Sequence, residues 1–311
     1  MAKYTLKKIF YTMFIYLLVI VSIFFALKLF SDPVQALLGQ DSTDEQKTQL
    51  AQELGLNENV HQQFQDYLTG IIFKFDFGNS YIQRDQKALN LFMGPFAITL
   101  TLSIISIFIA SFLGILAGMF AAYYQNSKKD YFILVLSILM ISTPSFIIGF
   151  LLQYFLGFRW MLFPISGLDS PSSWILPIIT LVLGQTFLIA RTVRNNIIEI
   201  LEQPYIVVAR AKGLSPTYIL FHHVLKNALI PIITQIGLLF SFMLGGSLIV
   251  ESIFTIDGVG SLIMESFTKR DIPVIRASII LLALFISIFN IALEVLYGCL
   301  DPKTKEKNRQ V

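Results

Sequence analysis

The chain has 311 residues, of which 55% are hydrophobic and only 14% are charged, and its mean hydropathy is +0.70. These values predict an all-α polytopic membrane protein and exclude a soluble globular domain and an outer-membrane barrel. The net charge of +3 is too small to suggest nucleic-acid binding, and no basic stripe with interleaved aromatic residues is present. The single cysteine, Cys299, rules out an internal disulfide and is expected to be a small apolar core residue.

The first predicted element is a retained membrane span over residues 1–30. Lys3, Lys7 and Lys8 precede an apolar run that starts at Ile9 and is too long for the core of a cleaved signal peptide. No cleavage site with small residues follows this run directly. The lysines therefore predict that the N-terminus lies in the cytoplasm.

Residues 31–95 are predicted to form a long extracytoplasmic segment with short amphipathic helices. Thr43 and Gln46 have the spacing of a capping box, which predicts a helix that ends at Gly55. Apolar residues at helical spacing over residues 60–72 predict a second helix with one apolar face. We expect this face on the membrane surface or against other spans, because about 65 residues with few apolar positions make a thin core for an independent domain.

Residues 96–300 are predicted to form a core of five further spans, at residues 96–124, 131–158, 174–193, 228–250 and 277–299. The second span of the chain carries a stripe of small residues at four-residue spacing: Ala110, Gly114, Gly118 and Ala122. Such a stripe lets a neighbouring helix approach closely, and packing within the chain and a subunit interface both explain it. In the third span, Pro144 frees a backbone carbonyl and predicts a kink beside a cavity or a neighbour.

The distribution of positive charge tests this six-span topology. Cytoplasmic loops of membrane proteins are enriched in Lys and Arg, and the rule is strongest for short loops. Most of the 23 Lys and Arg residues lie on the side that holds both termini, including those of the basic tail at residues 301–311. The sequence therefore predicts a multi-pass membrane protein with both termini in the cytoplasm.

The cytoplasmic loop at residues 196–226 contains the longest hydrophilic interruption in the C-terminal two thirds of the chain. From Tyr205 onward its spacing is that of a short amphipathic helix, in which Tyr205, Val208 and Ala209 share one face. Arg210 and Lys212 are expected to project away from that face. From periodicity alone, a basic linker on anionic lipid is the simpler interpretation.

The end of this predicted helix is marked by small residues. Gly213 supplies a C-terminal stop, and Ser215 with Pro216 starts a second helical piece. Ala209, Ala211 and Gly213 are small enough that another surface could approach the backbone closely.

Motifs for catalysis, nucleotide binding and metal binding are absent from the sequence. No G-x-x-x-x-G-K-[ST] loop, His-Glu-x-x-His, Gly-x-Ser-x-Gly or cysteine cluster occurs. His222 and His223 are adjacent, so on a helix they point about 100° apart and make a poor metal pair. We therefore expect no catalytic residue, no metal site and no cofactor in this chain.

One ionisable side chain lies well inside a predicted span. Glu294 follows Asn290 by one helical turn, on the same face of the sixth span. A carboxylate in lipid is costly, so it is expected to face protein or water. Glu294 either lines a translocation path together with Asn290 and the kink at Pro144, or pairs with a cation of another span.

Motifs along nearly the whole chain resemble the permease subunits of peptide- and nickel-type ABC importers. Ala209-Arg-Ala-Lys-Gly-Leu214 followed by Leu225-Lys-Asn-Ala-Leu-Ile-Pro231 is similar to the cytoplasmic coupling loop of that family. The other matches, in chain order, are Asp32-Pro33, Glu53-Leu-Gly-Leu56, Phe75-Asp-Phe-Gly-Asn-Ser80, Thr143-Pro-Ser-Phe146, Phe163-Pro-Ile-Ser-Gly167, Leu176-Pro-Ile-Ile-Thr-Leu181, Val250-Glu-Ser-Ile-Phe254, Asp271-Ile-Pro-Val-Ile275 and Tyr297-Gly-Cys-Leu-Asp-Pro302.

The resemblance implies an ATP-driven import complex in the lipid bilayer of the bacterial cell membrane. Its other parts would be a homologous second permease, two cytoplasmic ATP-binding subunits that use ATP and magnesium, and an extracytoplasmic substrate-binding protein. The two permeases would form the path for short peptides or for metal chelates such as nickel or metallophore complexes. The coupling residues would be Tyr205, Val208, Ala209, Arg210, Ala211, Lys212, Gly213 and Leu214, seated in a groove of an ATPase subunit.

The coupling loop also departs from the family pattern. The broader motif begins Glu-Ala-Ala, where this chain has Val207, Val208 and Ala209. Pro204 replaces the usual acidic residue before Tyr205, which removes a charge contact. In an outer loop, Ile256-Asp257 replaces a common aromatic-proline pair. These changes bear on the choice of partner subunits.

Two other classes of function compete with this interpretation. A secondary transporter or channel would work without ATPase partners and would use Glu294 as a proton or cation site, but the inverted repeats typical of that class are not seen. A membrane scaffold or sensor would need neither kinked spans nor a coupling loop.

Overall fold

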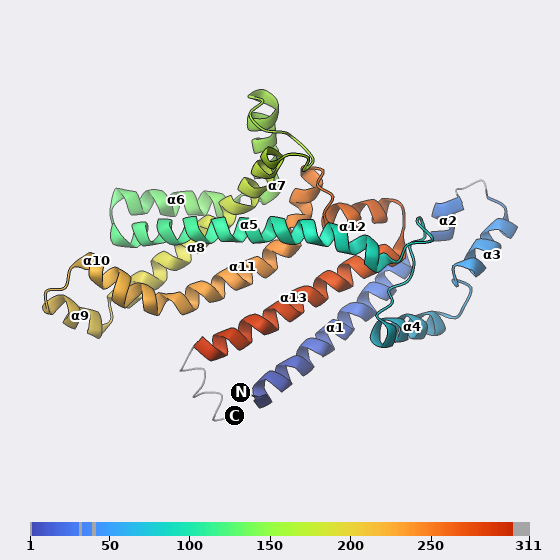
Figure 1. Cartoon of the computed structure of the whole chain (residues 1–311), viewed down its shortest axis with the longest axis horizontal. Helices are drawn as coiled ribbons and strands as arrows, with labels where there is room; N and C mark the ends of the chain where they lie inside the picture. Colours follow the sequence, from blue (N-terminus) through green and yellow to red (C-terminus); the bar gives the residue numbers. More distant parts are fainter. Residues whose placement is uncertain (1, 31–32, 39–41, 301–311) are drawn as a thin grey trace. The chain divides into compact units, whose positions relative to one another are not determined.

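A computed structural model of the chain describes residues 2–30, 33–38 and 42–300, with side chains over most of this range. The core position predicted for Cys299 and the tail at residues 301–311 lie outside the described side chains. The fold is all-α (Figure 1), and the described residues contain one isolated β-bridge, between Asn79 and Lys87. The α-helices are α1 (Ala2–Phe30), α2 (Pro33–Leu38), α3 (Asp44–Glu53), α4 (Val60–Thr69), α5 (Ala88–Tyr123), α6 (Lys128–Ser142), α7 (Ser145–Leu152), α8 (Ile175–Leu201), α9 (Pro204–Ala211), α10 (Pro216–Tyr218), α11 (Leu225–Ile253), α12 (Val259–Thr268) and α13 (Ile272–Leu300).

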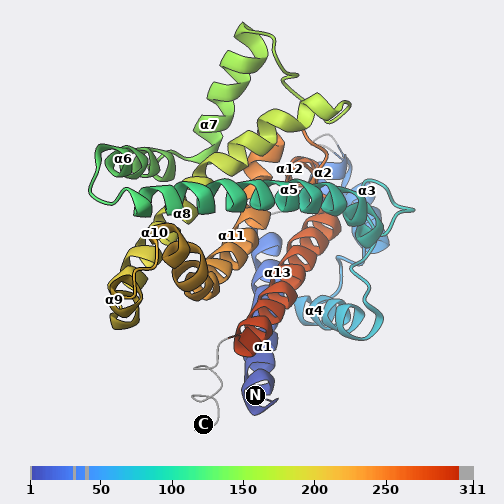
Figure 2. The ribbon, with the colours of Figure 1, turned by 60° about the vertical axis from the view of Figure 1, so that its left-hand side comes forward.

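Five helices of the described chain are long and apolar enough to cross a membrane. The pair Lys128–Ser142 and Ser145–Arg159 brings the number to six if it is one span. This pair is bent by 97° at residues 143–144, which is why Figure 2 shows α7 turning away from α6. The kink predicted at Pro144 is thus confirmed, and it is a complete break of the helix in which Pro144 is the N-cap of α7.

The described chain divides into two compact units that both combine segments distant in sequence. One unit consists of Thr5–Thr99 and Asp257–Ile288. The other consists mainly of Leu100–Ile256, with the C-terminal part of α13. Helices α5 and α13 contribute residues to both units.

In the first unit, helix α4 packs on α1 through aromatic side chains. The centre of the Phe24 ring lies 5.1 Å from the centre of the Phe64 ring and 5.5 Å from that of the Tyr67 ring. Ile71, which follows α4, is buried. The apolar face predicted for residues 60–72 therefore lies against another span, although Ile72 is exposed. The Tyr16 hydroxyl donates a hydrogen bond of 3.3 Å to the carbonyl oxygen of Ile280 and so joins α1 to α13.

The same unit confirms the capping box predicted for helix α3. The backbone N–H of Gln46 donates to Thr43 Oγ1 at 3.4 Å, and the backbone N–H of Thr43 donates to Gln46 Oε1 at 3.0 Å. Two of the donors left free at a helix N-terminus are satisfied in this way. After α3, Gly55 takes a φ of +67°, a conformation that favours glycine.

In the second unit, helix α8 packs against α5, α6, α7 and α11. The small-residue stripe of α5 faces α8: a Cβ added at Gly118 would lie 2.6 Å from the carbonyl oxygen of Ala190 and 2.6 Å from Val193 Cβ. A Cβ at Gly114 would lie 2.7 Å from Ile189 Cβ. Of the two explanations for the stripe, packing within the chain is therefore the one observed.

Candidate coupling loop and translocation path

Helix α9 is a short, locally specified helix between two long ones. Pro204 occupies its first position, where the missing N–H costs nothing and the fixed φ already suits a helix. It ends as predicted at Gly213, whose φ of +81° is the left-handed conformation common after helices. The backbone N–H of Gly213 donates to the carbonyl of Arg210 at 2.9 Å. The Ser215 hydroxyl then caps α10 by accepting from the backbone N–H of Tyr218 at 3.3 Å.

The buried face of α9 differs by one residue from the face defined by periodicity. Ile206 is completely buried and Ala209 is 8% exposed, and they are three residues apart on one face. Tyr205 and Val208, which share the predicted face with Ala209, are 44% and 55% exposed. The helix has only two turns, so the neighbouring segment, and not the apolar pattern, decides which side chains it buries.

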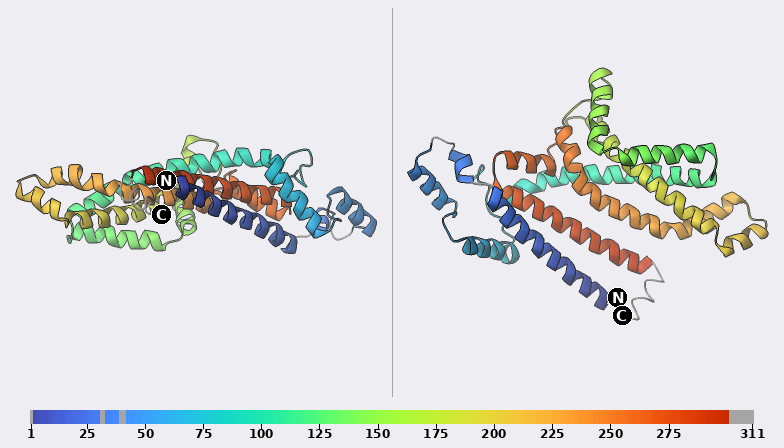
Figure 3. Two further views of the ribbon diagram at one scale, coloured as in Figure 1. Left: turned by 90° about the horizontal axis from the view of Figure 1, so that it is seen from below. Right: turned by 180° about the vertical axis from the view of Figure 1, so that it is seen from behind.

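Helix α9 is tied to the segment that follows it. It packs on the π-helical turn Ile219–Val224, whose residues Ile219 and Val224 are buried. The Asn227 Nδ2 group at the start of α11 donates a hydrogen bond of 2.9 Å to the Tyr205 hydroxyl. Figure 3 shows α9 and α10 at one end of the α8 and α11 pair.

Most of the residues predicted for coupling form an exposed surface at this tip, whereas Ala209, predicted among them, is buried. Arg210, Ala211, Lys212 and Gly213 are all exposed, and Leu214 is half-buried. Beside these basic and small residues, the side chains of Val207 and Val208 are also open. Within this unit the surface thus combines apolar, small and cationic groups with no described part of the chain covering them.

An ion pair near this loop had no counterpart among the sequence predictions. Arg194 of α8 donates from Nε to Asp130 Oδ1 at 2.6 Å and from Nη2 to Asp130 Oδ2 at 2.7 Å. The backbone N–H of Asn126 donates to Asp130 Oδ2 at 2.9 Å, and the Asp130 side chain is 1% exposed. This bidentate pair joins the first turn of α6 to α8, and its partners are separated by 64 residues, which hides it from sequence periodicity.

The residues proposed for a translocation path do not gather at one site. Pro144 lines an apolar cavity of about 490 Å³ between the broken α6–α7 pair, α8 and α11, and Asn290 and Glu294 are not part of its lining. Asn290 Oδ1 accepts a hydrogen bond of 2.7 Å from the Ser241 hydroxyl of α11. Glu294 is half-buried.

Two polar side chains in the second unit have environments that sequence reasoning did not predict. Gln185 lines the cavity beside Pro144, and its Oε1 atom has no hydrogen-bond partner among the described residues. Glu251 lies near the end of the fifth span, where its position in the sequence predicts a place at the membrane interface; it is instead completely buried in α11 and accepts a hydrogen bond of 3.0 Å from the Ser247 hydroxyl. No periodicity marks either residue, because each lies within a largely apolar run.

Long apolar helices, a broken span and an exposed basic helix between two spans define a polytopic membrane protein. Two inward-facing structures of the MetNI methionine ABC transporter share its fold. One has a TM-score of 0.59 at 18% identity and covers 68% of this chain and 96% of that chain. The other has a TM-score of 0.58 at 19% identity and covers 65% of this chain and 93% of that chain.

Sequence comparisons extend over the whole chain. The family described as "Binding-protein-dependent transport system inner membrane component" matches residues 114–306, and its N-terminal counterpart matches residues 1–103. The glutathione transport system permease protein GsiC of Salmonella typhimurium strain LT2 is 34% identical over 99% of this chain and 100% of its own length. GsiC of Escherichia coli strain K12 is 34% identical over 89% of this chain and 90% of its own length.

The chain therefore belongs to the permeases of binding-protein-dependent ABC importers, in the peptide- and nickel-type group. It is a non-catalytic, multi-pass subunit of the bacterial inner membrane. The family implies a complex with ATPase subunits, which hydrolyse ATP, and with a binding protein. This membership displaces the secondary transporter, the channel and the scaffold as general interpretations.

Proposed function

We propose that this chain forms, with a second homologous permease, the path by which short peptides enter the cell, and that α9 couples this path to an ATPase subunit. The exposed tip of α9 carries the proposal. Val207 and Val208 offer apolar area, Ala211 permits close approach, and Arg210 and Lys212 can meet carboxylates of a partner.

The contacts of α9 provide a route for mechanical work. The buried Ile206 and Ala209 and the hydrogen bond from Asn227 to Tyr205 hold α9 against the start of α11. Helix α8 leads directly into α9 and is held to α6 by the Arg194–Asp130 pair. Movement of α9 with an ATPase subunit would therefore displace α8, α11 and α6 together, because packed helices move as rigid elements.

The alternation between inward-open and outward-open states follows from differential stability. ATP-bound closure of two ATPase subunits would favour the outward-open arrangement of the two permeases, and hydrolysis would restore the inward-open one. Cargo would arrive from a docked binding protein. In this arrangement both termini and α9 lie in the cytoplasm, and residues 31–95 lie outside.

Short peptides are proposed as cargo because the relatives named above are permeases of glutathione transport, and glutathione is a peptide. A metal chelate, either of nickel or of a metallophore, is the other cargo class predicted from the sequence, and no observation favours it here. The division of the chain at residues 30, 95 and 300 also stays a prediction.

Cysteine cross-linking tests the coupling role. In a chain with Cys299→Ser, Ala211→Cys is expected to form an adduct with an ATPase subunit through a short reagent that joins its thiol to a lysine amine of that subunit. Ala209→Cys is the matched control, because it lies two residues away and is only 8% exposed. Absence of any adduct for single cysteines placed along residues 205–214 would contradict coupling through α9.

Uptake measurements separate the two cargo classes. A strain that lacks this chain is expected to lose uptake of a labelled tripeptide and to retain uptake of a labelled nickel chelate, and expression of the chain is expected to restore the first. Loss of chelate uptake with normal peptide uptake would overturn the peptide assignment and leave the coupling role intact.

A further inference from the structure

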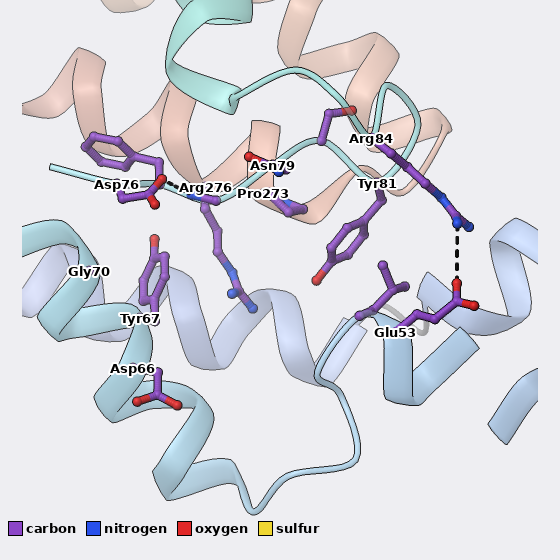
Figure 4. A pocket seen from close by; sticks show the side chains of 14 residues that line it. Glu53, Asp66, Tyr67, Gly70, Asp76, Asn79, Tyr81, Arg84, Pro273 and Arg276 are labelled. Atoms are coloured by element: carbon purple, nitrogen blue, oxygen red, sulfur yellow. Dashed lines mark hydrogen bonds and ion pairs between the residues drawn. The ribbon is translucent and has the colours of Figure 1, made fainter. Parts of the chain in front are cut away.

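The unit formed by Thr5–Thr99 and Asp257–Ile288 contains a polar pocket of about 570 Å³, a volume suited to a small-molecule ligand. Its wall comes from α3, α4, the segment at residues 76–84 and the first turn of α13. Figure 4 shows the Arg276 side chain extending between the Tyr67 and Tyr81 rings. None of these residues belongs to the coupling loop or to the path candidates described above.

Arg276 is a largely enclosed cation without a counter-charge in the described part of the chain. Its guanidinium carbon lies 4.6 Å from the centre of the Phe24 ring and 5.1 Å from that of Tyr67. Its Nε atom is buried and has no hydrogen-bond partner, and no described carboxylate forms an ion pair with it. Aromatic rings pack well against the flat faces of a guanidinium, whereas hydrogen bonds to its edge need an acceptor in its plane.

Two tyrosine hydroxyls supply further donors beside this cation. The Tyr67 hydroxyl is buried and has no hydrogen-bond partner among the described residues. Burial raises the pKa of Tyr67 and that of Tyr81 above their ordinary value, so both hydroxyl groups keep their proton at neutral pH and can donate it in a hydrogen bond. Buried donors without acceptors are costly in a folded protein, and a bound acceptor would remove that cost.

The loop that bears Tyr81 is fixed in place, so the pocket is a built feature. The Ser80 hydroxyl and the backbone N–H of Tyr81 both donate to the buried carboxylate of Asp271, the second at 3.0 Å. The Ser80 Oγ atom in turn accepts hydrogen bonds from the backbone N–H groups of Ile82 and Gln83 at 3.1 and 2.8 Å.

The charges of the pocket wall indicate which anion would fit. Of the two described cations that line the pocket, Arg84 is exposed and already paired with Glu53 at 3.3 Å, whereas Arg276 lacks a counter-charge. Asp66, which is exposed, and Asp76, which is half-buried, also line the pocket. A doubly charged phosphate would meet repulsion from these two carboxylates, whereas a carboxylate on a molecule that also carries an ammonium group matches both signs.

We propose that this pocket binds a small zwitterionic solute, an amino acid or short peptide, whose carboxylate lies in the plane of the Arg276 guanidinium with the Tyr67 hydroxyl as a further donor. The ammonium group of the solute would face Asp66 and Asp76. The proposal rests on the proposed function only in placing the pocket on the outer side of the membrane, where solute would arrive. Binding itself needs neither coupling through α9 nor ATP.

Protection of a single cysteine at the pocket measures this binding directly. Asn79 lines the pocket and is exposed, so Asn79→Cys, in a chain with Cys299→Ser, gives a maleimide-reactive group there. The membrane complex, purified through a tag on this chain without its binding protein, is placed in nanodiscs. The labelling rate is then measured with alanyl-alanine, with its C-terminal amide, and with inorganic phosphate.

Alanyl-alanine is expected to slow labelling in a saturable manner. Its C-terminal amide is expected to need a concentration roughly ten- to hundredfold higher for the same protection, because a charged hydrogen-bond pair is lost. Arg276→Gln is expected to abolish the protection and Tyr67→Phe to weaken it several-fold. Equal protection by acid and amide, protection by phosphate as strong as by the dipeptide, or no saturable protection would overturn the proposal. If Arg276→Gln fails to assemble, an unchanged affinity in Tyr67→Phe overturns it instead. Failure of cross-linking at α9 would leave this measurement unaffected.

Discussion

Replacement of Gly118 by alanine probes how closely α5 and α8 pack. The added methyl group would lie 2.6 Å from both the Ala190 carbonyl oxygen and Val193 Cβ, whereas ordinary contact begins at 3.4 Å. The two helices would therefore have to separate by about 0.8 Å, the difference between these distances. Neither obstacle is the far end of a flexible side chain, so rotamer changes cannot relieve the clash.

The expected cost follows from two opposing effects. Overpacking in a close-packed region costs about 1–3 kcal/mol, and the rigid obstacles place this site in the upper half of that range. The higher helix propensity of alanine returns about 0.5–1 kcal/mol. Gly118→Ala is therefore expected to destabilise the chain by roughly 1–2 kcal/mol, which lowers the unfolding midpoint by a few degrees.

Thermal unfolding of the purified chain in detergent, followed by the fraction that stays monodisperse in size-exclusion chromatography, measures this effect. Gly245→Ala in α11 is the matched control, because a Cβ added there meets nothing within 4 Å. It is expected to be neutral or to stabilise by up to about 1 kcal/mol through helix propensity. The close packing of α5 on α8 would be refuted if Gly118→Ala were as stable as Gly245→Ala.

Three further predictions concern residues outside the close helix contact. Arg194→Ala leaves the buried carboxylate of Asp130 without its cation and is expected to destabilise the chain by up to about 3–5 kcal/mol. A double variant that also carries Asp130→Asn is expected to recover part of this loss. Equal unfolding midpoints for the single and the double variant would contradict the reasoning. At Gly213 the backbone has a φ of +81°, so Gly213→Ala is expected to lower the free energy of unfolding by about 1 kcal/mol and to lower ATP-dependent uptake. Gly213→Asn is expected to have a milder effect on both. Identical uptake by the two variants would show that the turn is unimportant. Asp271→Ala removes the acceptor of the Ser80 hydroxyl and of the Tyr81 amide, and it is expected to speed amide hydrogen exchange at residues 80–83. An unchanged exchange rate would show that Asp271 does not hold this loop in place.

Local features of the fold could be predicted from the sequence because they depend on neighbouring residues. The capping box at Thr43, the helix stop at Gly213 and the break at Pro144 each follow from the conformational preferences of one or two residues. The long apolar runs likewise indicate spans. The family resemblance came from many ordered motifs, and the comparisons confirm it.

Features that depend on distant residues could not be predicted in this way. Arg194 pairs with Asp130 across 64 residues, and the carboxylate of Asp271 binds the Tyr81 amide across 190 residues. The environment of Arg276 similarly depends on aromatic side chains of α1 and α4. For α9, hydrophobicity alone does not distinguish Ile206 from Val208, and the choice is made by contact with the turn at residues 219–224. The coupling and path residues stay predictions until they are tested.

The break between α6 and α7 has a consequence for the life of the subunit in the cell. Residues 143–144 leave the helical conformation within a segment apolar enough for the bilayer, and the Pro144 side chain is exposed on this chain. Lipid tails offer no hydrogen bonds to non-helical backbone, so this face requires protein or water against it. If the proposed second permease covers this face, a copy synthesised without it would leave non-helical backbone against lipid, and the amount of one permease in the membrane would thereby limit that of the other.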